Sequence, residues 1–122
     1  MTIQNPKAYV DGLWDWGVLR GCFGNTKIEP TDIDGFVERN GKFLILETKD
    51  NGVEIKQGQQ LTFNALVKTG LFTIIVIWGN PGNPKRIRVI TSKADRNFKN
   101  SSLEQLRDIV SQWFNYAEGY YW

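Results

Sequence analysis

The sequence predicts an α/β protein in which a mixed β-sheet lies between helices, and three observations support this. An Asn-Gly pair between two apolar runs indicates a tight hairpin around residues 39–42. Residues 71–78 are apolar on both faces of a strand, which requires a covering layer on each side. Residues 101–117 repeat apolar side chains at three- and four-residue steps, as an amphipathic helix does. The length of 122 residues fits one domain spanning residues 1–122.

The first half of the chain is expected to contain one helix and one hairpin. Residues 9–23 have roughly helical spacing and are followed by turn-forming residues. From Ile33 the pattern is that of a strand, which the Asn40-Gly41 turn connects to a second strand beginning at Phe43. Asn-Gly suits this turn because both central positions need a positive φ. The apolar side chains that define the first helix are Val10, Leu13, Trp14, Leu19 and Phe23.

The second half is expected to contain a helix, two strands and a final helix. The first of these helices covers residues 57–69 and ends before Gly70. A second strand, residues 86–91, follows the buried one after a loop over residues 79–84. The final helix begins with a capping box formed by Ser101 and Glu104. Three side chains of the 57–69 helix are expected to face the core: Leu61, Ala65 and Leu66.

The composition excludes several classes of chemistry. Hydrophobic residues make up 41% and charged residues 23%, which is typical of globular proteins and not of disordered chains. Histidine is absent, which excludes histidine bases and imidazole zinc sites, and the single Cys22 excludes a disulfide framework. We interpret Cys22 as a small buried side chain. Neither GxGxxG nor GxxxxGK[ST] occurs, so no organic cofactor is expected.

Nothing in the sequence indicates a membrane span or a signal peptide. The longest apolar run, residues 71–78, has eight residues, whereas a helix that crosses a bilayer needs about 20. The N-terminus lacks a basic segment followed by an apolar stretch. We therefore expect an intracellular protein that makes no membrane contact.

The net charge of +2 is too small to identify a nucleic-acid-binding protein, but its distribution is uneven. Residues 1–61 contain 7 basic and 9 acidic residues, whereas residues 62–122 contain 8 and 4. Three basic residues of the second half, Lys85, Arg86 and Arg88, are candidates for contacts with nucleic-acid phosphates. A solvated strand face is the alternative interpretation.

The register of the predicted hairpin brings acidic residues and a lysine to one face. The residues that flank a two-residue turn pair with each other, and counting outward from them brings Asp34 opposite Glu47. If the ladder continues, Asp32 lies opposite Lys49. Because side chains alternate between faces, all four project from the same face. The alternative is that these charges are solvated groups at the ends of strands.

Two opposed carboxylates repel each other, so this arrangement calls for a compensating charge. Mg²⁺ is a natural candidate because it binds through one or two protein carboxylates and takes further ligands from water and phosphate. Lys49 would point into the same site. An ammonium group there could orient an attacking water and stabilise negative charge in the transition state.

This pattern resembles the PD-(D/E)XK nuclease superfamily over about residues 28–79. The motif residues follow one another in the order Pro30-Thr-Asp-Ile-Asp34-Gly, Glu47-Thr-Lys49 and Gln59, which opens a helix. The similarity is nearest to small phage-type, VRR-NUC-like or Holliday-junction-resolvase-like members. It implies a single-domain restriction-endonuclease-like fold, with a central mixed β-sheet flanked by helices.

The resemblance also implies roles for individual residues. Asp34 and Glu47 would bind Mg²⁺ or Mn²⁺ together with the Thr48 carbonyl. Lys49 would be the catalytic lysine, and Gln59 would assist it. The implied substrate is DNA, and the implied place of action is the cytoplasm of a bacterial or phage-infected cell.

Other residues are weaker candidates. Many superfamily members carry an acidic residue on the first helix, for which Asp15 is the best match, and Asp32 is a possible additional member of the site. Trp14 and Trp16 are interpreted as core or helix-packing residues and not as ligand contacts. The aromatic C-terminus is a candidate for base stacking, a dimer contact or packing on the fold: Tyr120, Tyr121 and Trp122.

We therefore expect a metal-dependent endonuclease that hydrolyses DNA phosphodiester bonds, with branched or junction DNA as a candidate substrate. A homodimer is plausible because one small active site cuts one strand. The alternative is a non-catalytic module that retains the nuclease fold and binds nucleic acid or protein. Metal-dependent hydrolysis of another substrate is a third option.

Overall fold

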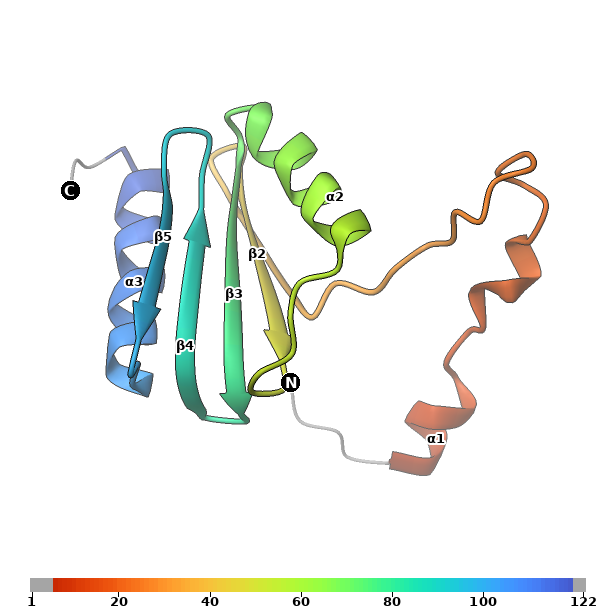
Figure 1. The fold of residues 1–122 in the computed structure, drawn as a ribbon, viewed down its shortest axis with the longest axis horizontal. Coiled ribbons are helices and arrows are strands. Elements are labelled where there is room, and N and C mark those ends of the chain that lie inside the picture. Colours follow the sequence, from red (N-terminus) through yellow and green to blue (C-terminus); the bar gives the residue numbers. More distant parts are fainter. Residues whose placement is uncertain (1–5, 120–122) are drawn as a thin grey trace. The chain divides into compact units, whose positions relative to one another are not determined.

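The structure is a computed structural model and describes residues 6–119. The chain divides into two compact units, with the boundary between Asp32 and Ile33. The first unit contains the short helix α1 (Pro6–Asp11) and the 3-10 helix η1 (Trp16–Leu19). The second unit is an α/β structure with a five-stranded mixed sheet and two longer helices (Figure 1).

The helix predicted over residues 9–23, in a pattern already broken by Gly17, is wrong in its extent. Helix α1 ends at Asp11, and η1 is a single short turn that follows an irregular stretch. Gly12 and Gly17 interrupt the apolar pattern, and glycine disfavours a helix because it loses the most backbone entropy on ordering. The helical spacing of the apolar residues was therefore not enough to specify one helix.

Three side chains of the first unit that were interpreted as buried are exposed. Trp14 is 74% exposed and Trp16 is 39% exposed, and the two rings lie near each other with centroids 6.2 Å apart. Cys22 is a free and exposed cysteine. The interpretation of these three residues as core residues is therefore wrong, since apolar character alone does not provide a core for a segment of this length.

The sheet has the strand order β1-β2-β3-β4-β5. Strands β2 and β3 are parallel, and every other neighbouring pair is antiparallel. The parallel pair requires a crossover, which the helix between β2 and β3 supplies. The strand bounds are β1 Gly35–Arg39, β2 Lys42–Lys49, β3 Phe72–Asn80, β4 Asn83–Ile90 and β5 Asp95–Lys99.

The predicted hairpin and its register are confirmed. Arg39 pairs with Lys42 across the turn, and the pairing continues outward to Gly35 and Leu46. Asn40 and Gly41, the two central residues of the turn, have φ angles of 53° and 75°. This is the left-handed conformation that a type I′ turn requires. The strand begins at Gly35 rather than at Ile33.

The sheet is covered on both faces, as the apolar character of residues 71–78 predicts. Helix α2 (Gln57–Lys68) packs on one face, where a cluster includes Ile45, Ile74 and Trp78. Helix α3 (Leu103–Ala117) packs on the other, where Leu44 and Ile87 are buried (Figure 1). Within residues 6–119, none of the helices combines the length and apolar character that a membrane span requires.

The predicted inward face of α2 is only partly correct. Phe63 and Val67 are the buried residues, with exposed fractions of 4% and 7%, and Leu66 packs against their cluster. Leu61 is 61% exposed, and Ala65 is also exposed. The pair Leu61 and Ala65 and the pair Phe63 and Val67 both have four-residue spacing, so helical periodicity alone allowed either pair to face the sheet. The aromatic ring buries more apolar surface, and its stripe is the one that faces the sheet.

Three further differences concern the C-terminal half. Strand β5 was not predicted, because Phe98 is its single half-buried apolar residue. The expected loop over residues 79–84 is a two-residue turn between extended strands, with a β-bulge between Trp78 and Gly79. The N-cap of α3 is Ser102 instead of Ser101, and its hydroxyl accepts a hydrogen bond from the Gln105 N–H at 3.1 Å.

Candidate active site

Glu47 and Lys49 lie at the C-terminal end of β2, and their side chains project from the face of the sheet that α2 covers. Ile45, two residues earlier, belongs to the α2-side core, and alternation places both charged residues on that same face. The Glu47 Oε1 and Lys49 Nζ atoms are 3.9 Å apart. Their side chains are only 15% and 13% exposed, so the ion pair is held at the edge of the core and is not a freely solvated surface pair.

Asp34 is joined to the same strand by hydrogen bonds. Its Oδ2 atom accepts one hydrogen bond from the Thr48 N–H at 2.8 Å and another from the Thr48 hydroxyl at 3.1 Å. In an uninterrupted ladder with this register, the Thr48 N–H would donate to the carbonyl of Ile33. The carboxylate therefore takes the place of a backbone acceptor at the point where β1 begins.

This arrangement corrects the expected pairing. The ladder begins with the Gly35–Leu46 pair, so Asp34 and Glu47 lie just beyond it and are not an opposed strand pair. The extension that would bring Asp32 opposite Lys49 is likewise not formed. Asp34 turns instead toward the backbone of Thr48, because a carboxylate gains more from a peptide N–H than from facing another carboxylate.

The oxygen atoms at this end of β2 are of the chemical type that binds a hard divalent cation. Asp34 Oδ1 makes no hydrogen bond within the described part of the chain, and Asp34 is exposed. The N–H and C=O of one strand residue point toward the same neighbour, so the Thr48 carbonyl faces the open edge next to Asp34. Carboxylate and carbonyl oxygens are the donors that Mg²⁺ and Mn²⁺ prefer.

The carboxylates are few in number. No group of three or more His, Cys, Asp or Glu side chains that could hold a metal occurs among residues 6–119. The predicted donors are Glu47, Asp34 and the Thr48 carbonyl, which include only two such side chains, and their role as metal ligands stays a prediction. Sets of one or two carboxylates suit Mg²⁺ sites in which water and substrate phosphate complete the coordination.

Two glutamines of α2 face the sheet near its N-terminus. Gln59, the predicted residue, is half-buried and precedes the buried Phe63 by one helical turn. Gln60, a second amide of this first turn, accepts a hydrogen bond from Arg88 Nη1 at 2.9 Å and donates one to Asn64 at 2.9 Å. Gln60 belongs to the same inward stripe of α2 as Phe63 and Val67.

The arginines of β4 lie on the same face of the sheet as Glu47 and Lys49. One row of Cα partners runs from Glu47 through Val76 to Arg88, and the next runs from Lys49 through Trp78 to Arg86. Lys85 is skipped by the β3–β4 ladder at the bulge next to Gly79 and has no partner in β3. The three predicted basic residues are therefore not equivalent.

Arg88 is already neutralised by a neighbour on β5. Its Nη2 and Nε atoms donate to the Asp95 carboxylate at 2.6 and 2.9 Å. These hydrogen bonds are the main reason that the pKa of Arg88 is raised and the pKa of Asp95 is lowered from its ordinary value. Arg88 thus links β5 to Gln60 of α2, and most of its charge is compensated within the protein.

Arg86 is more available. Its guanidinium carbon lies 4.3 Å from the centroid of the Trp78 ring, and its Nε and Nη2 atoms donate to Asn97 Oδ1 at 3.2 and 2.7 Å. Among the described residues no carboxylate forms an ion pair with it. Arg86 is exposed, so its positive charge remains accessible on this face.

The candidates of the first unit have local contacts. Asp15 is the N-cap of η1, and its Oδ1 accepts a hydrogen bond from the Gly17 N–H at 2.8 Å. Asp32 is exposed and is the last residue of this unit. A metal-binding role for either residue stays a prediction. The aromatic residues 120–122 lie outside the described residues.

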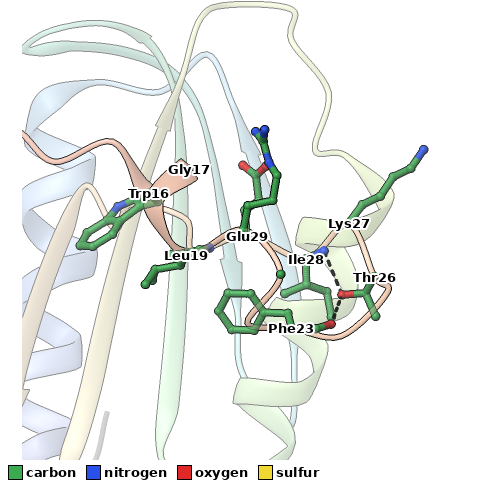
Figure 2. A pocket seen from close by; sticks show the side chains of 11 residues that line it. Trp16, Gly17, Leu19, Phe23, Thr26, Lys27, Ile28 and Glu29 are labelled. Carbon is green, nitrogen blue, oxygen red and sulfur yellow. Dashed lines mark hydrogen bonds between the residues drawn. The ribbon is translucent and has the colours of Figure 1, made fainter.

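The first unit also has a pocket of its own, with a volume of about 270 Å³ (Figure 2). Trp16 and Phe23 contribute aromatic walls, and Lys27 and Glu29 contribute charges. Thr26 stabilises the loop, since its hydroxyl donates to the Phe23 carbonyl at 2.7 Å and accepts from the Ile28 N–H at 3.2 Å. None of the residues predicted to form the active site lines this pocket.

The candidate site is thus defined by its own geometry, and comparison with known proteins adds nothing to it. No protein-family model, curated protein or solved structure matches this chain.

Proposed function

We propose that this protein is a metal-dependent endonuclease that hydrolyses DNA phosphodiester bonds. The observation that carries the proposal is the arrangement at the end of β2, where Asp34 is bonded to Thr48 between Glu47 and Lys49. The resemblance of these residues to the PD-(D/E)XK motif supports the same reading. Solvated strand-end charges would not be expected to combine a half-buried ion pair with a carboxylate fixed by the strand backbone.

In this proposal Asp34, Glu47 and the Thr48 carbonyl hold Mg²⁺ or Mn²⁺. When bound, the cation would supply Lewis-acid chemistry, making a water molecule more acidic and neutralising the scissile phosphate. This chemistry needs no histidine, which the chain lacks.

The protein's own groups would orient the reactants. Glu47 keeps the Lys49 ammonium in place through their ion pair, and Lys49 donates hydrogen bonds to the attacking water and to a phosphate oxygen. Gln59 would help to position that water. The water oxygen forms the new bond to phosphorus and releases a proton to solvent, while the bond to the leaving deoxyribose oxygen breaks and that oxygen takes up a proton from solvent.

The first experiment is cleavage of supercoiled plasmid and of a labelled four-way junction, with Mg²⁺, Mn²⁺ or EDTA. Wild type is compared with Lys49→Ala and with Lys68→Ala, which removes an exposed lysine at the end of α2. We expect cleavage that requires the metal, disappears in Lys49→Ala and persists in Lys68→Ala. The preferred substrate would indicate whether branched DNA is the target.

Absence of cleavage on plasmid, junction, single-stranded and flap DNA would contradict the proposal. DNA binding that is indifferent to chelator would then favour the non-catalytic interaction module. The proposal also includes action in the cytoplasm of a bacterial or phage-infected cell and a possible homodimer. Sedimentation of the protein with and without DNA tests the dimer.

A further inference from the structure

A shallow groove of about 440 Å³ lies beside the candidate active site, between the start of α2 and strands β3 and β4. Its lining combines two arginines, two glutamines, one carboxylate and an aromatic ring. These residues are Arg86, Arg88, Gln57, Gln60, Glu54 and Trp78, and the apolar side chains of Ile55 and Leu61 complete the lining. The groove is open to solvent and carries donors suited to an anionic ligand, which makes it a candidate track for a nucleic-acid backbone.

The sheet places this groove at a defined distance from the proposed reaction centre. Lys49 is the Cα partner of Trp78, and Trp78 is the partner of Arg86. Neighbouring strands are about 4.8 Å apart, so Lys49 and Arg86 are separated by about 10 Å across the sheet. This is the axial rise of about three nucleotides on one DNA strand. A DNA strand that is cut beside Lys49 can therefore bring a phosphate to Arg86 within a few nucleotides of the cleaved bond.

The electrostatics distinguish Arg86 from its basic neighbours. Arg88 donates to Asp95 and Gln60, so binding a phosphate would require breaking existing hydrogen bonds. Lys85 is not among the residues that line the groove. Arg86 lines it, is exposed, and forms no ion pair with any described carboxylate. A phosphate could therefore neutralise the charge of Arg86 without breaking an existing ion pair.

The Arg86 side chain is also preorganised. Trp78 is 3% exposed, and its ring provides a platform under the guanidinium. The Trp78 Nε1–H donates to the Val53 carbonyl, which fixes the ring. Asn97 accepts two hydrogen bonds from Nε and Nη2, leaving Nη1 free to donate within the described structure. A guanidinium held in this way loses little rotamer entropy when a phosphate binds.

We propose that Arg86 is a phosphate contact for the DNA strand that enters the active site. This inference rests on the proposed nuclease function. Arg86 contributes affinity at a phosphate away from the cleaved bond. Arg88 holds Gln60 and the start of α2 against the sheet. Glu54 opposes the substrate charge from the rim of the groove.

The test measures DNA binding at several salt concentrations in EDTA, where cleavage is prevented, using fluorescence anisotropy of a labelled oligonucleotide. Arg86→Gln is compared with Arg107→Gln, which removes an exposed arginine on α3, the helix on the opposite face of the sheet. Loss of one phosphate contact reduces the slope of log K against log salt by about 0.7 to 0.9. We expect this reduction in Arg86→Gln and an unchanged slope in Arg107→Gln.

Two further variants keep the proposal testable if Arg86→Gln is unstable. Glu54→Gln removes an exposed carboxylate of the groove and should tighten DNA binding by about two- to threefold. Lys85→Gln removes the adjacent charge that does not line the groove, and it should reduce the slope by less than Arg86→Gln does. In cleavage assays, Arg86→Gln should raise KM about tenfold and leave kcat nearly unchanged. The reason is that a phosphate away from the cleaved bond is bound equally strongly in the ground state and in the transition state.

Equal salt slopes for Arg86→Gln and wild type would overturn the Arg86 proposal, even if metal-dependent cleavage is observed. Equal reductions in all three basic variants would also overturn it, because a diffuse charge effect would then explain binding. No binding effect of Glu54→Gln would contradict the placement of DNA in this groove. Absence of cleavage with the expected salt slopes would instead contradict the nuclease proposal and leave the phosphate contact in place.

Discussion

The Asp34 carboxylate accepts hydrogen bonds from both the backbone N–H and the hydroxyl of Thr48, through its Oδ2 atom alone. One short contact therefore ties the segment before β1 to the end of β2. It also orients Asp34 Oδ1 as a free acceptor within the described structure. The first prediction follows from this pair.

Thr48→Val removes the hydroxyl donor and keeps the backbone N–H and the β-branched shape. We expect the apparent affinity for Mn²⁺ to fall about tenfold, since groups that orient a ligand have effects of this size. The free energy of unfolding should fall by only about 0.5 to 1 kcal/mol, because Thr48 is exposed. Mn²⁺ titration and urea unfolding measure the two effects. Thr48→Ser retains the donor and should resemble wild type; equal Mn²⁺ affinities for all three proteins would refute the role of this hydroxyl.

The Glu47–Lys49 pair predicts opposite effects on metal binding. Mn²⁺ should raise the melting temperature of wild type, by an amount equivalent to about 2.7 kcal/mol at one hundred times Kd. Glu47→Gln should abolish this increase. Lys49→Met should preserve or enlarge it, because the Lys49 Nζ atom lies 3.9 Å from the Glu47 carboxylate and competes with a cation. Differential scanning fluorimetry with and without Mn²⁺ checks both signs, and a Lys49→Met protein that no longer responds to Mn²⁺ would contradict the arrangement.

The Arg88–Asp95 pair predicts a pH-dependent part of the stability. Arg88 lowers the pKa of Asp95 below its ordinary value of 3.8, so the folded state binds fewer protons than the unfolded state in that region. The stabilisation is present above about pH 4 and is lost as the pH falls through the lowered pKa. Since the Asp95 side chain is 47% exposed, we expect the ion pair to contribute less than about 1 kcal/mol to the free energy of unfolding.

Urea unfolding of wild type and Asp95→Asn between about pH 2.5 and about pH 7 measures the effect, because this range extends from below the ordinary pKa of 3.8 to a pH at which the carboxylate is fully charged. The difference in unfolding free energy should be largest at neutral pH and shrink in acid. Asp108→Asn, at an exposed position on α3, is the matched control for the removal of a surface carboxylate. A difference that is constant with pH would show that the ion pair does not stabilise the fold.

Replacing glycine by alanine is expected to change the stability in opposite directions at Gly41, in the hairpin turn, and at Gly58, in helix α2. Gly41 has a φ of 75°, so Gly41→Ala should destabilise the protein by about 1 to 2 kcal/mol through left-handed strain. Gly58 lies in the first turn of α2 with no atom within 4 Å of an added Cβ. Gly58→Ala should stabilise the protein by up to about 1 kcal/mol. Thermal unfolding of both variants measures these changes. A Gly41→Ala variant more stable than wild type would contradict the left-handed conformation of Gly41 in the turn.

The inward face of α2 predicts different costs for two neighbouring apolar residues. Phe63 is 4% exposed and Leu61 is 61% exposed. Phe63→Ala should cost about 3 to 5 kcal/mol of unfolding free energy, whereas Leu61→Ala should cost less than about 0.5 kcal/mol. Urea unfolding measures both values. Comparable losses in the two variants would mean that Leu61 is buried in solution.

The sequence by itself determined the features that depend on a few consecutive residues. The Asn40-Gly41 pair specified the turn and hence the register from Gly35 to Leu46, because a two-residue turn leaves one choice of pairing. Residues 71–78 specified a strand buried on both faces, because polar positions are nearly absent there. The amphipathic C-terminal helix was also specified locally, with an error of one residue in its N-cap.

Only the tertiary structure decided which surfaces these elements share. Leu61 and Phe63 both fit a helical stripe, and contact with the sheet selected Phe63. Strand β5 has little apolar character of its own and is ordered by pairing with β4, where Asp95 meets Arg88. Arg88 reaches Gln60, 28 residues away, because the β2–α2–β3 crossover brings α2 over the sheet. Short-range sequence patterns cannot encode such contacts, since their partners are brought together only when the crossover closes.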